Sequence, residues 1–223
     1  MKVVRVKICG MTRLADAEKA IELGADALGF IFAESPRQIT PQKARDISRR
    51  ISPFVKTVGV FINEKPAKIR KIMDFCGLDL VQLHGNEPVS ACSELAPRVI
   101  KAFRVQGEES LLRITDFKNH VRAILLDAYQ KGLNGGTGKT FDWRLALKAK
   151  KTGIPMVLSG GLGPENIREA LEQVHPFAVD ISSGIEERPG IKDHGKMRIF
   201  MEKIKDYERK GTARRALTIP PEA

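Results

Sequence analysis

The chain repeats one pattern of hydrophobic and polar positions along most of its length. Short runs rich in Val, Ile and Leu alternate with stretches in which apolar residues recur every three or four positions, and loops with Gly, Ser or Asn separate them. The runs predict eight strands, at 3–9, 26–32, 56–62, 78–84, 98–105, 122–128, 155–160 and 177–183. The stretches between them predict helices, most clearly at 12–24, 40–51, 65–77 and 163–174, and in the first of these Thr12 is the expected N-cap and Gly24 the expected C-terminal glycine.

Strands that alternate with helices imply a parallel sheet whose connections are right-handed crossovers. Eight such units in 223 residues leave about 28 residues for each, which is typical of a small (β/α)8 TIM barrel. We therefore expect an α/β fold with a single closed, eight-stranded parallel sheet in residues 1–207, and an open doubly wound sheet is the alternative. Residues 208–223 are polar, basic and proline-ended, so we expect a flexible basic tail there.

Composition narrows the class of protein. Hydrophobic residues make up 42% of the chain and charged residues 29%, and neither a membrane-spanning run nor a signal-peptide core is present, so we expect a cytoplasmic protein with no membrane partner. The formal charge is +11, but the basic residues are spread along the chain, and only one Trp and two Tyr are present that could stack on bases. This pattern favours a solvated basic surface, so we expect no nucleic-acid partner. Three cysteines without a C-x-x-C pair argue against disulfides and against a structural zinc.

In a TIM barrel the chemistry lies at the carboxyl ends of the strands, where this chain is polar and glycine-rich. Two glycine-bearing loops follow the seventh and eighth predicted strands, where backbone N–H groups of such barrels bind phosphate. We therefore predict a phosphate monoester site, with Pro164 in the first turn of the next helix. Its predicted residues are Gly160, Gly161, Ser182, Ser183 and Gly184.

Seven segments at these strand ends resemble the phosphoribosylanthranilate isomerases of tryptophan biosynthesis, from about residue 3 to 204. They are KICGMT (7–12), GFIFAESPR (29–37), VQLHGNE (81–87), LLDA (125–128), GGTGKTFDW (135–143), LSGGLGPENI (158–167) and VDISSGIEERPGIKD (179–193). The resemblance implies an Amadori rearrangement of N-(5-phosphoribosyl)anthranilate, the third step from chorismate, by acid–base catalysis without a metal or cofactor.

Residue roles follow from the same resemblance. It implies that Cys9 is the general base, that Asp127 is the general acid and that Arg37 binds the anthranilate carboxylate. His84 either orients the substrate or caps the barrel mouth, and residues 135–143 are expected to cover the site as a mobile loop, with Asp142 capping the next helix and Trp143 packing on the barrel. Cys76 and Cys92, on helical segments, are expected to be buried core residues.

Strand parity adds a prediction of its own. If Cys9 points into the barrel, the two-residue period of a strand sends Lys7 inward as well, and the same argument from Asp127, His84 and Ser182 sends Leu125, Gln82 and Asp180 inward. A buried Lys7 needs a partner, so we predict a Lys7–Asp180 ion pair beneath the site, with Lys7 favouring the thiolate of Cys9. The alternative is that Lys7 points outward.

Three rival functions remain. A barrel synthase acting on an indole precursor is expected to show catalytic Lys and Glu at strand ends, and a histidine-pathway isomerase typically pairs two aspartates and shows two-fold internal similarity. A basic barrel that binds nucleic acid without catalysis is the rival from another class. The sequence leaves open whether the protein is a monomer or a homodimer.

Overall fold

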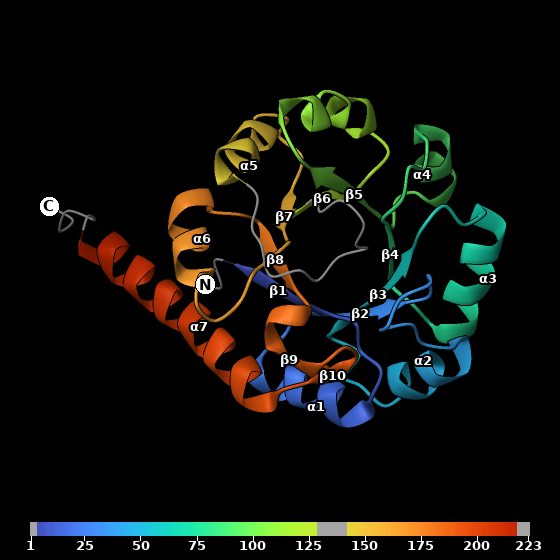
Figure 1. Cartoon of the computed structure of the whole chain (residues 1–223), viewed down its shortest axis with the longest axis horizontal. Helices are drawn as coiled ribbons and strands as arrows, with labels where there is room; N and C mark the ends of the chain where they lie inside the picture. Colours follow the sequence, from blue (N-terminus) through green and yellow to red (C-terminus); the bar gives the residue numbers. More distant parts are fainter. Residues whose placement is uncertain (1–3, 129–141, 218–223) are drawn as a thin grey trace, which may run out of the picture.

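The computed structural model, which describes residues 4–128 and 142–217, is a barrel of eight parallel strands (Figure 1). Hydrogen bonds join each strand to the next in sequence order, and β8 pairs with β1 to close the ring, so the closed barrel is confirmed over the open sheet. The strands are β1 (Arg5–Cys9), β2 (Ala27–Ile31), β3 (Lys56–Phe61), β4 (Leu80–Leu83), β5 (Val99–Val105), β6 (Ala123–Ala128), β7 (Met156–Leu158) and β8 (Ala178–Ile181).

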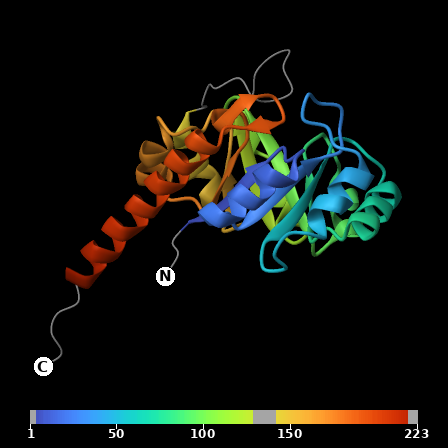
Figure 2. The ribbon, with the colours of Figure 1, turned by 90° about the horizontal axis from the view of Figure 1, so that it is seen from below.

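Helices surround the barrel on the outside (Figures 1 and 2). They are α1 (Leu14–Leu23), α2 (Pro41–Ser48), α3 (Pro66–Cys76), α4 (Val89–Leu95), α5 (Trp143–Lys150), α6 (Ile167–Val174) and α7 (His194–Leu217). Two short 3-10 turns, η1 (Glu108–Leu111) and η2 (Ile114–Phe117), occupy the connection between β5 and β6. After β8 come the 3-10 turn η3 (Ser183–Ile185) and a small hairpin of β9 (Glu186–Arg188) and β10 (Ile191–Lys192).

Alternate residues of each strand divide the core into two. Residues such as Val58, Ala102 and Leu125 form a cluster inside the barrel. Residues between them, such as Leu83 and Ile124, belong to the larger cluster that lies between the strands and the helices. Polar residues, among them Gln82 and Asp180, are also buried inside the barrel, nearer the carboxyl ends of the strands.

The observed helix caps agree only in part with those predicted from the sequence. Gly24 ends α1 with φ 100°, and Asp142 caps α5 by accepting a hydrogen bond from the Arg144 N–H, as predicted. The N-cap prediction for Thr12 is wrong: α1 begins after Arg13, and the Thr12 hydroxyl instead donates to the Gly190 carbonyl in the β9–β10 hairpin. Pro164 is also not in the first turn of α6, because that helix begins at Ile167.

The last helix, α7, extends into the region where the sequence predicted a flexible tail. α7 continues to Leu217 and extends away from the barrel (Figure 2), so the predicted boundary at residue 207 falls inside a helix. Within residues 4–128 and 142–217, no helix is both long enough and apolar enough to cross a membrane.

Candidate active site

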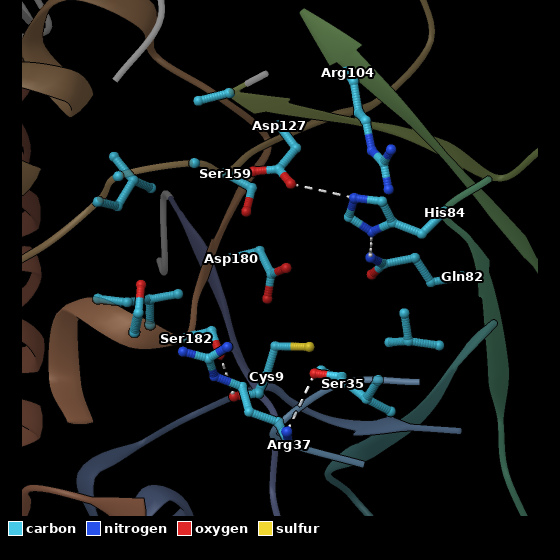
Figure 3. A pocket seen from close by; sticks show the side chains of 18 of the residues that line it. Cys9, Ser35, Arg37, Gln82, His84, Arg104, Asp127, Ser159, Asp180 and Ser182 are labelled. Atoms are coloured by element: carbon cyan, nitrogen blue, oxygen red, sulfur yellow. Dashed lines mark hydrogen bonds and ion pairs between the residues drawn. The ribbon is translucent and has the colours of Figure 1, made fainter. Parts of the chain in front are cut away.

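A pocket opens at the carboxyl ends of the strands, and Figure 3 shows the side chains around it. Nine of the eleven predicted site residues line this pocket: Cys9, Arg37, His84, Asp127, Gly160, Gly161, Asp180, Ser182 and Ser183. The other two lie just outside it. Lys7 is two residues below Cys9 on β1, and Gly184 packs so closely on the loop after β7 that a Cβ there would collide with the Leu162 carbonyl oxygen.

Cys9 is the last residue of β1 and is 5% exposed. Its partner across the β1–β2 ladder is Gly29, and a Cβ at Gly29 would lie 2.6 Å from the Cys9 sulfur. Only glycine therefore leaves room for the thiol to point into the pocket. The sequence contained Gly29 in the GFIF segment, but nothing in the local pattern showed that it faces Cys9.

Beneath the thiol lies the predicted ion pair, in which Lys7 Nζ donates to Asp180 Oδ1 at 2.9 Å. Both side chains are about 5% exposed. Their strands are neighbours where the ring closes, and Lys7 and Asp180 are direct partners in the ladder. Burial alone lowers the pKa of Lys7, but the Asp180 carboxylate and Cys9 outweigh it, so the pKa of Lys7 is raised and the lysine is a cation.

Lys7 is only one of several factors that shift the pKa of Cys9. Burial raises the pKa of the Cys9 thiol, Lys7 lowers it, Asp180 raises it and Lys192 lowers it. The contribution of Lys7 thus favours the thiolate, as predicted, but the net pKa of Cys9 lies above the ordinary thiol value in the free protein. The reason is that a buried strand end removes the water that would solvate the anion.

Asp127 lies on the opposite side of the pocket from Cys9 (Figure 3). His84 Nε2 is 3.2 Å from Asp127 Oδ2, and Gln82 Nε2 is 2.8 Å from His84 Nδ1. The Asp127 side chain is 15% exposed, and Arg104 pairs with it across the β5–β6 ladder and also lines the pocket. His84 thus contacts the predicted acid directly, a link that sequence reasoning did not make.

Arg37 is buried rather than a solvated surface residue. Its Nε and Nη2 bond to the Glu186 carboxylate at 2.8–3.0 Å, so one edge of the guanidinium fork is already occupied. Glu186 also accepts from Lys192 Nζ at 2.9 Å, and Lys192 Nζ is 3.2 Å from the Ser182 carbonyl. Arg37 and Lys192 thus share one carboxylate, and burial lowers the pKa of Lys192 although Glu186 acts to raise it.

The two glycine-bearing loops lie side by side above β7 and β8. Gly160 and Gly161 have φ of 81° and 64°, a conformation that favours glycine. The Asn166 side chain accepts from the Gly163 N–H and donates to the Gly161 carbonyl, which fixes the first loop. The result is a stretch of backbone held open toward the pocket.

Another buried ion pair fixes the loop that carries His84. Lys101 Nζ donates to Glu87 Oε2 at 2.9 Å and to the carbonyls of Leu83, Gly85 and Ala102. Glu87 in turn accepts from the Gly85 and Asn63 N–H groups. Burial raises the pKa of Glu87, but Lys101 and these N–H groups outweigh it and hold the pKa below the usual value. Sequence reasoning missed this pair.

Other predictions concern the two remaining cysteines, the expected covering loop and metal binding. Cys76 and Cys92 are buried and unpaired, as expected of core residues. Trp143 packs on the core, but residues 129–141, which contain most of the expected covering loop, lie outside the described residues. In residues 4–128 and 142–217, no three His, Cys, Asp or Glu side chains gather as a metal site would require.

Fold and site together define a (β/α)8-barrel enzyme with candidate acid and base groups on opposite sides of one pocket. A model of the N-(5′-phosphoribosyl)anthranilate (PRA) isomerase family matches residues 6–203. The chain therefore belongs to the N-(5′-phosphoribosyl)anthranilate isomerase family, and it is an isomerase.

Individual relatives agree with the family match. The N-(5′-phosphoribosyl)anthranilate isomerase of Geobacter sulfurreducens is 51% identical over 205 residues, which is 92% of this chain and 100% of that protein. A solved structure of monomers generated from the dimeric enzyme of Thermotoga maritima is 45% identical with a TM-score of 0.82, covering 91% of this chain and 99% of that one. Another solved structure, a phosphoribosylanthranilate isomerase bound to reduced 1-(o-carboxyphenylamino)-1-deoxyribulose 5-phosphate, is 46% identical, with the same TM-score and coverage.

Proposed function

We propose that this protein catalyses the Amadori rearrangement of N-(5-phosphoribosyl)anthranilate to 1-(2-carboxyphenylamino)-1-deoxyribulose 5-phosphate in cytoplasmic tryptophan biosynthesis, its third step from chorismate. The observation that carries the proposal is the placement of Cys9 and Asp127 on opposite sides of one pocket (Figure 3). A sugar between them meets a proton donor on one face and a proton acceptor on the other.

The reaction needs two proton transfers at different atoms. In the proposed mechanism Asp127 gives its proton to the furanose ring oxygen, so that the ring C–O bond breaks and a Schiff base forms. The Cys9 thiolate then removes the proton from C2, and the resulting enolamine tautomerises to the ketone. No electrons leave the substrate, so this route calls for no redox partner.

The remaining predicted residues bind the two anionic ends of the substrate. Gly160 and Gly161 of one loop and Ser182 to Gly184 of the other are proposed to receive the phosphate through backbone N–H groups. Arg37 is proposed to bind the anthranilate carboxylate with the guanidinium edge that Glu186 leaves open. His84 is proposed to act on Asp127 rather than merely cap the mouth.

Loss of anthranilate fluorescence, followed while the protein consumes freshly made phosphoribosylanthranilate, tests the proposal. Cys9→Ala is expected to lower kcat by about 10²- to 10⁴-fold, the usual contribution of a positioned base. Cys92→Ala, at a cysteine that is equally buried but lies on α4, is the matched control and is expected to keep full activity. An active Cys9→Ala protein, or a wild type that does not consume the substrate, would overturn the assignment.

For the assembly we propose a homodimer rather than a monomer. At the amino ends of the strands a cavity of about 550 Å³ is lined by apolar residues such as Ala27, Leu80 and Val157 together with charged ones such as Arg5, Lys56 and Arg122, and Phe54 lies at it with 93% of its surface exposed. A two-fold axis at this face would bring each Phe54 to the cavity of the other copy. A dimeric relative, the Thermotoga maritima enzyme, supports this choice.

Sedimentation velocity tests the assembly. The wild type is expected to sediment as a dimer and Phe54→Ala as a monomer, because the ring that would fill the cavity of the other copy is lost. Leu112→Ala, at an exposed leucine that does not line the cavity, is the matched control and is expected to remain dimeric. A wild type that stays monomeric at high concentration contradicts the homodimer without touching the catalytic proposal.

A further inference from the structure

A row of three hydrogen-bonded side chains runs along one wall of the pocket, from Gln82 through His84 to Asp127 (Figure 3). Gln82 is an inward residue of β4, 1% exposed, and His84 follows two residues later on the same face. The first link measures 2.8 Å and the second 3.2 Å. The mechanism described above uses the last residue of the row and leaves Gln82 without a role.

The direction of the first hydrogen bond determines the rest of the row. The Gln82 amide nitrogen can only donate, so His84 Nδ1 accepts and the single proton of a neutral imidazole lies on Nε2. That proton is directed at Asp127 Oδ2, which must therefore accept. The proton that Asp127 delivers as an acid then has to be on the other oxygen, Oδ1. A Cβ at Gly160 would lie 2.9 Å from Oδ1, so this oxygen is beside the loop after β7.

A second observation concerns the other end of the same amide. Gln82 Oε1 is buried and has no hydrogen-bond partner among the residues that the structure describes. Buried acceptors in native proteins are nearly always paired, and an unpaired one in a ligand pocket points to a donor on the ligand. The donors that the proposed substrate offers to the middle of the pocket are its ribose hydroxyl groups.

We propose that Gln82 is a positioning residue with two tasks. It holds His84 in the Nε2–H tautomer, so that His84 donates to Oδ2 of the Asp127 carboxyl group and the acidic proton stays on Oδ1, from which it is given to the ring oxygen. Its Oε1 accepts a hydrogen bond from a ribose hydroxyl of the bound substrate. The second task rests on the proposed function, whereas the first is a property of the free protein.

The reversed amide gives a different and distinguishable arrangement. With Oε1 toward His84, the imidazole proton lies on Nδ1 and Nε2 becomes an acceptor. Asp127 then has to carry its proton on Oδ2 and give it to His84 rather than to the substrate. The tautomer of His84 therefore reports which carboxyl oxygen is the acid.

Long-range ¹H–¹⁵N spectra of the ¹⁵N-histidine protein test the first task, because the two tautomers give different nitrogen shifts. The chain has four histidines, and His84→Gln identifies the signal of His84. We expect the Nε2–H tautomer in the wild type and the Nδ1–H form in Gln82→Glu, whose carboxylate only accepts. His120, which contacts Ser93 away from the pocket, is the internal control and should not change. An Nδ1–H tautomer in the wild type, or no change in Gln82→Glu, overturns the proposal.

A double-mutant cycle tests the consequence for catalysis. Gln82→Met is expected to lower kcat by about 10- to 100-fold through His84, and to raise KM by about 5-fold through the lost hydroxyl contact. In a His84→Gln background, the side-chain amide donates to Asp127 without any tautomer, so Gln82→Met should lower kcat by less than about 3-fold. An equal loss of kcat in both backgrounds overturns the positioning role of Gln82, even where the isomerase activity itself has been demonstrated. An unchanged KM in Gln82→Met overturns the hydrogen bond to the ribose hydroxyl.

Discussion

On the Cys9 side of the pocket the functional group lies among buried ion pairs, whereas on the Asp127 side it ends a row of hydrogen-bonded side chains. Cys9 has Lys7 and Lys192 near it, and each lysine is paired with a carboxylate, Asp180 or Glu186. Asp127 contacts His84, which contacts the Gln82 amide. The comparison shows that the proposed base and the proposed acid require different surroundings. A base buried away from water needs cations to become an anion at all, whereas an acid needs a defined direction for its proton.

The largest expected effects come from removing either functional group. Asp127→Asn keeps the shape of the side chain but has no acidic proton, and Cys9→Ser replaces the thiol by a far less acidic hydroxyl. Each is expected to lower kcat by about 10²- to 10⁴-fold in single-turnover fluorescence experiments. Asp116→Asn, at an exposed aspartate remote from the pocket, is the control and should match the wild type. A full rate from either site variant would show that its side of the pocket does no chemistry.

The buried Lys101–Glu87 pair bears on the same comparison, because it lies on the Asp127 side but stabilises the fold and does not line the pocket. Lys101→Met leaves the Glu87 carboxylate buried without its partner and is expected to lower the free energy of unfolding by about 3–5 kcal/mol. Lys56→Met breaks the Lys56–Asp79 pair, whose lysine is 57% exposed, and should cost less than about 1 kcal/mol. Urea denaturation measures both. Equal costs would mean that burial of the first pair has no energetic consequence.

The pH dependence of kcat/KM tests the role of charge on the Cys9 side. The proposed mechanism needs the Cys9 thiolate, and burial raises the pKa of Cys9, so activity should increase with pH through that pKa. Lys7 lowers the pKa of Cys9, so Lys7→Met should move the ascending limb to higher pH and reduce activity near neutrality. Gln82→Met, on the other side, should leave this limb in place. A limb that stays where it is in Lys7→Met would show that Lys7 does not act on the base.

A smaller effect is expected at Arg37, the residue proposed to bind the substrate carboxylate. Glu186→Gln weakens the bond that holds Arg37 and should raise KM by about 5- to 10-fold with little change in kcat. Inhibition by inorganic phosphate should change less than this KM, because Glu186 reaches the phosphate loops only through Lys192 and its contact with the Ser182 carbonyl. Glu187→Gln, at the exposed neighbour, is the matched control. A loss in kcat alone would place Glu186 in the chemistry instead.

Most of the barrel could be predicted from the sequence, because strand parity and the order of elements are local properties. The same parity argument correctly sent Lys7, Gln82, Leu125 and Asp180 into the barrel and paired Lys7 with Asp180. Local signals failed where a residue serves a distant one. Thr12 is a good N-cap by type, yet its hydroxyl contacts the β9–β10 hairpin 178 positions away.

Burial and long-range pairing explain what the sequence did not show in the site. Lys101 and Glu87 look like ordinary surface residues in the sequence, and only the fold makes them a buried pair. Arg37 and Glu186 are 149 positions apart. The pKa of Cys9 depends on the balance between burial, two lysines and Asp180, so the residue types alone gave the effect of Lys7 but not the net direction.

The central claim is that Cys9 removes the C2 proton while Asp127 opens the ring, and a deuterium isotope effect separates the two steps. With phosphoribosylanthranilate deuterated at C2, Cys9→Ser should show a large primary isotope effect on kcat, because proton removal has become the slow step. Asp127→Asn should show an isotope effect near one, because ring opening now limits the rate. The reverse pattern, with the isotope effect lost in Cys9→Ser and large in Asp127→Asn, would contradict the account.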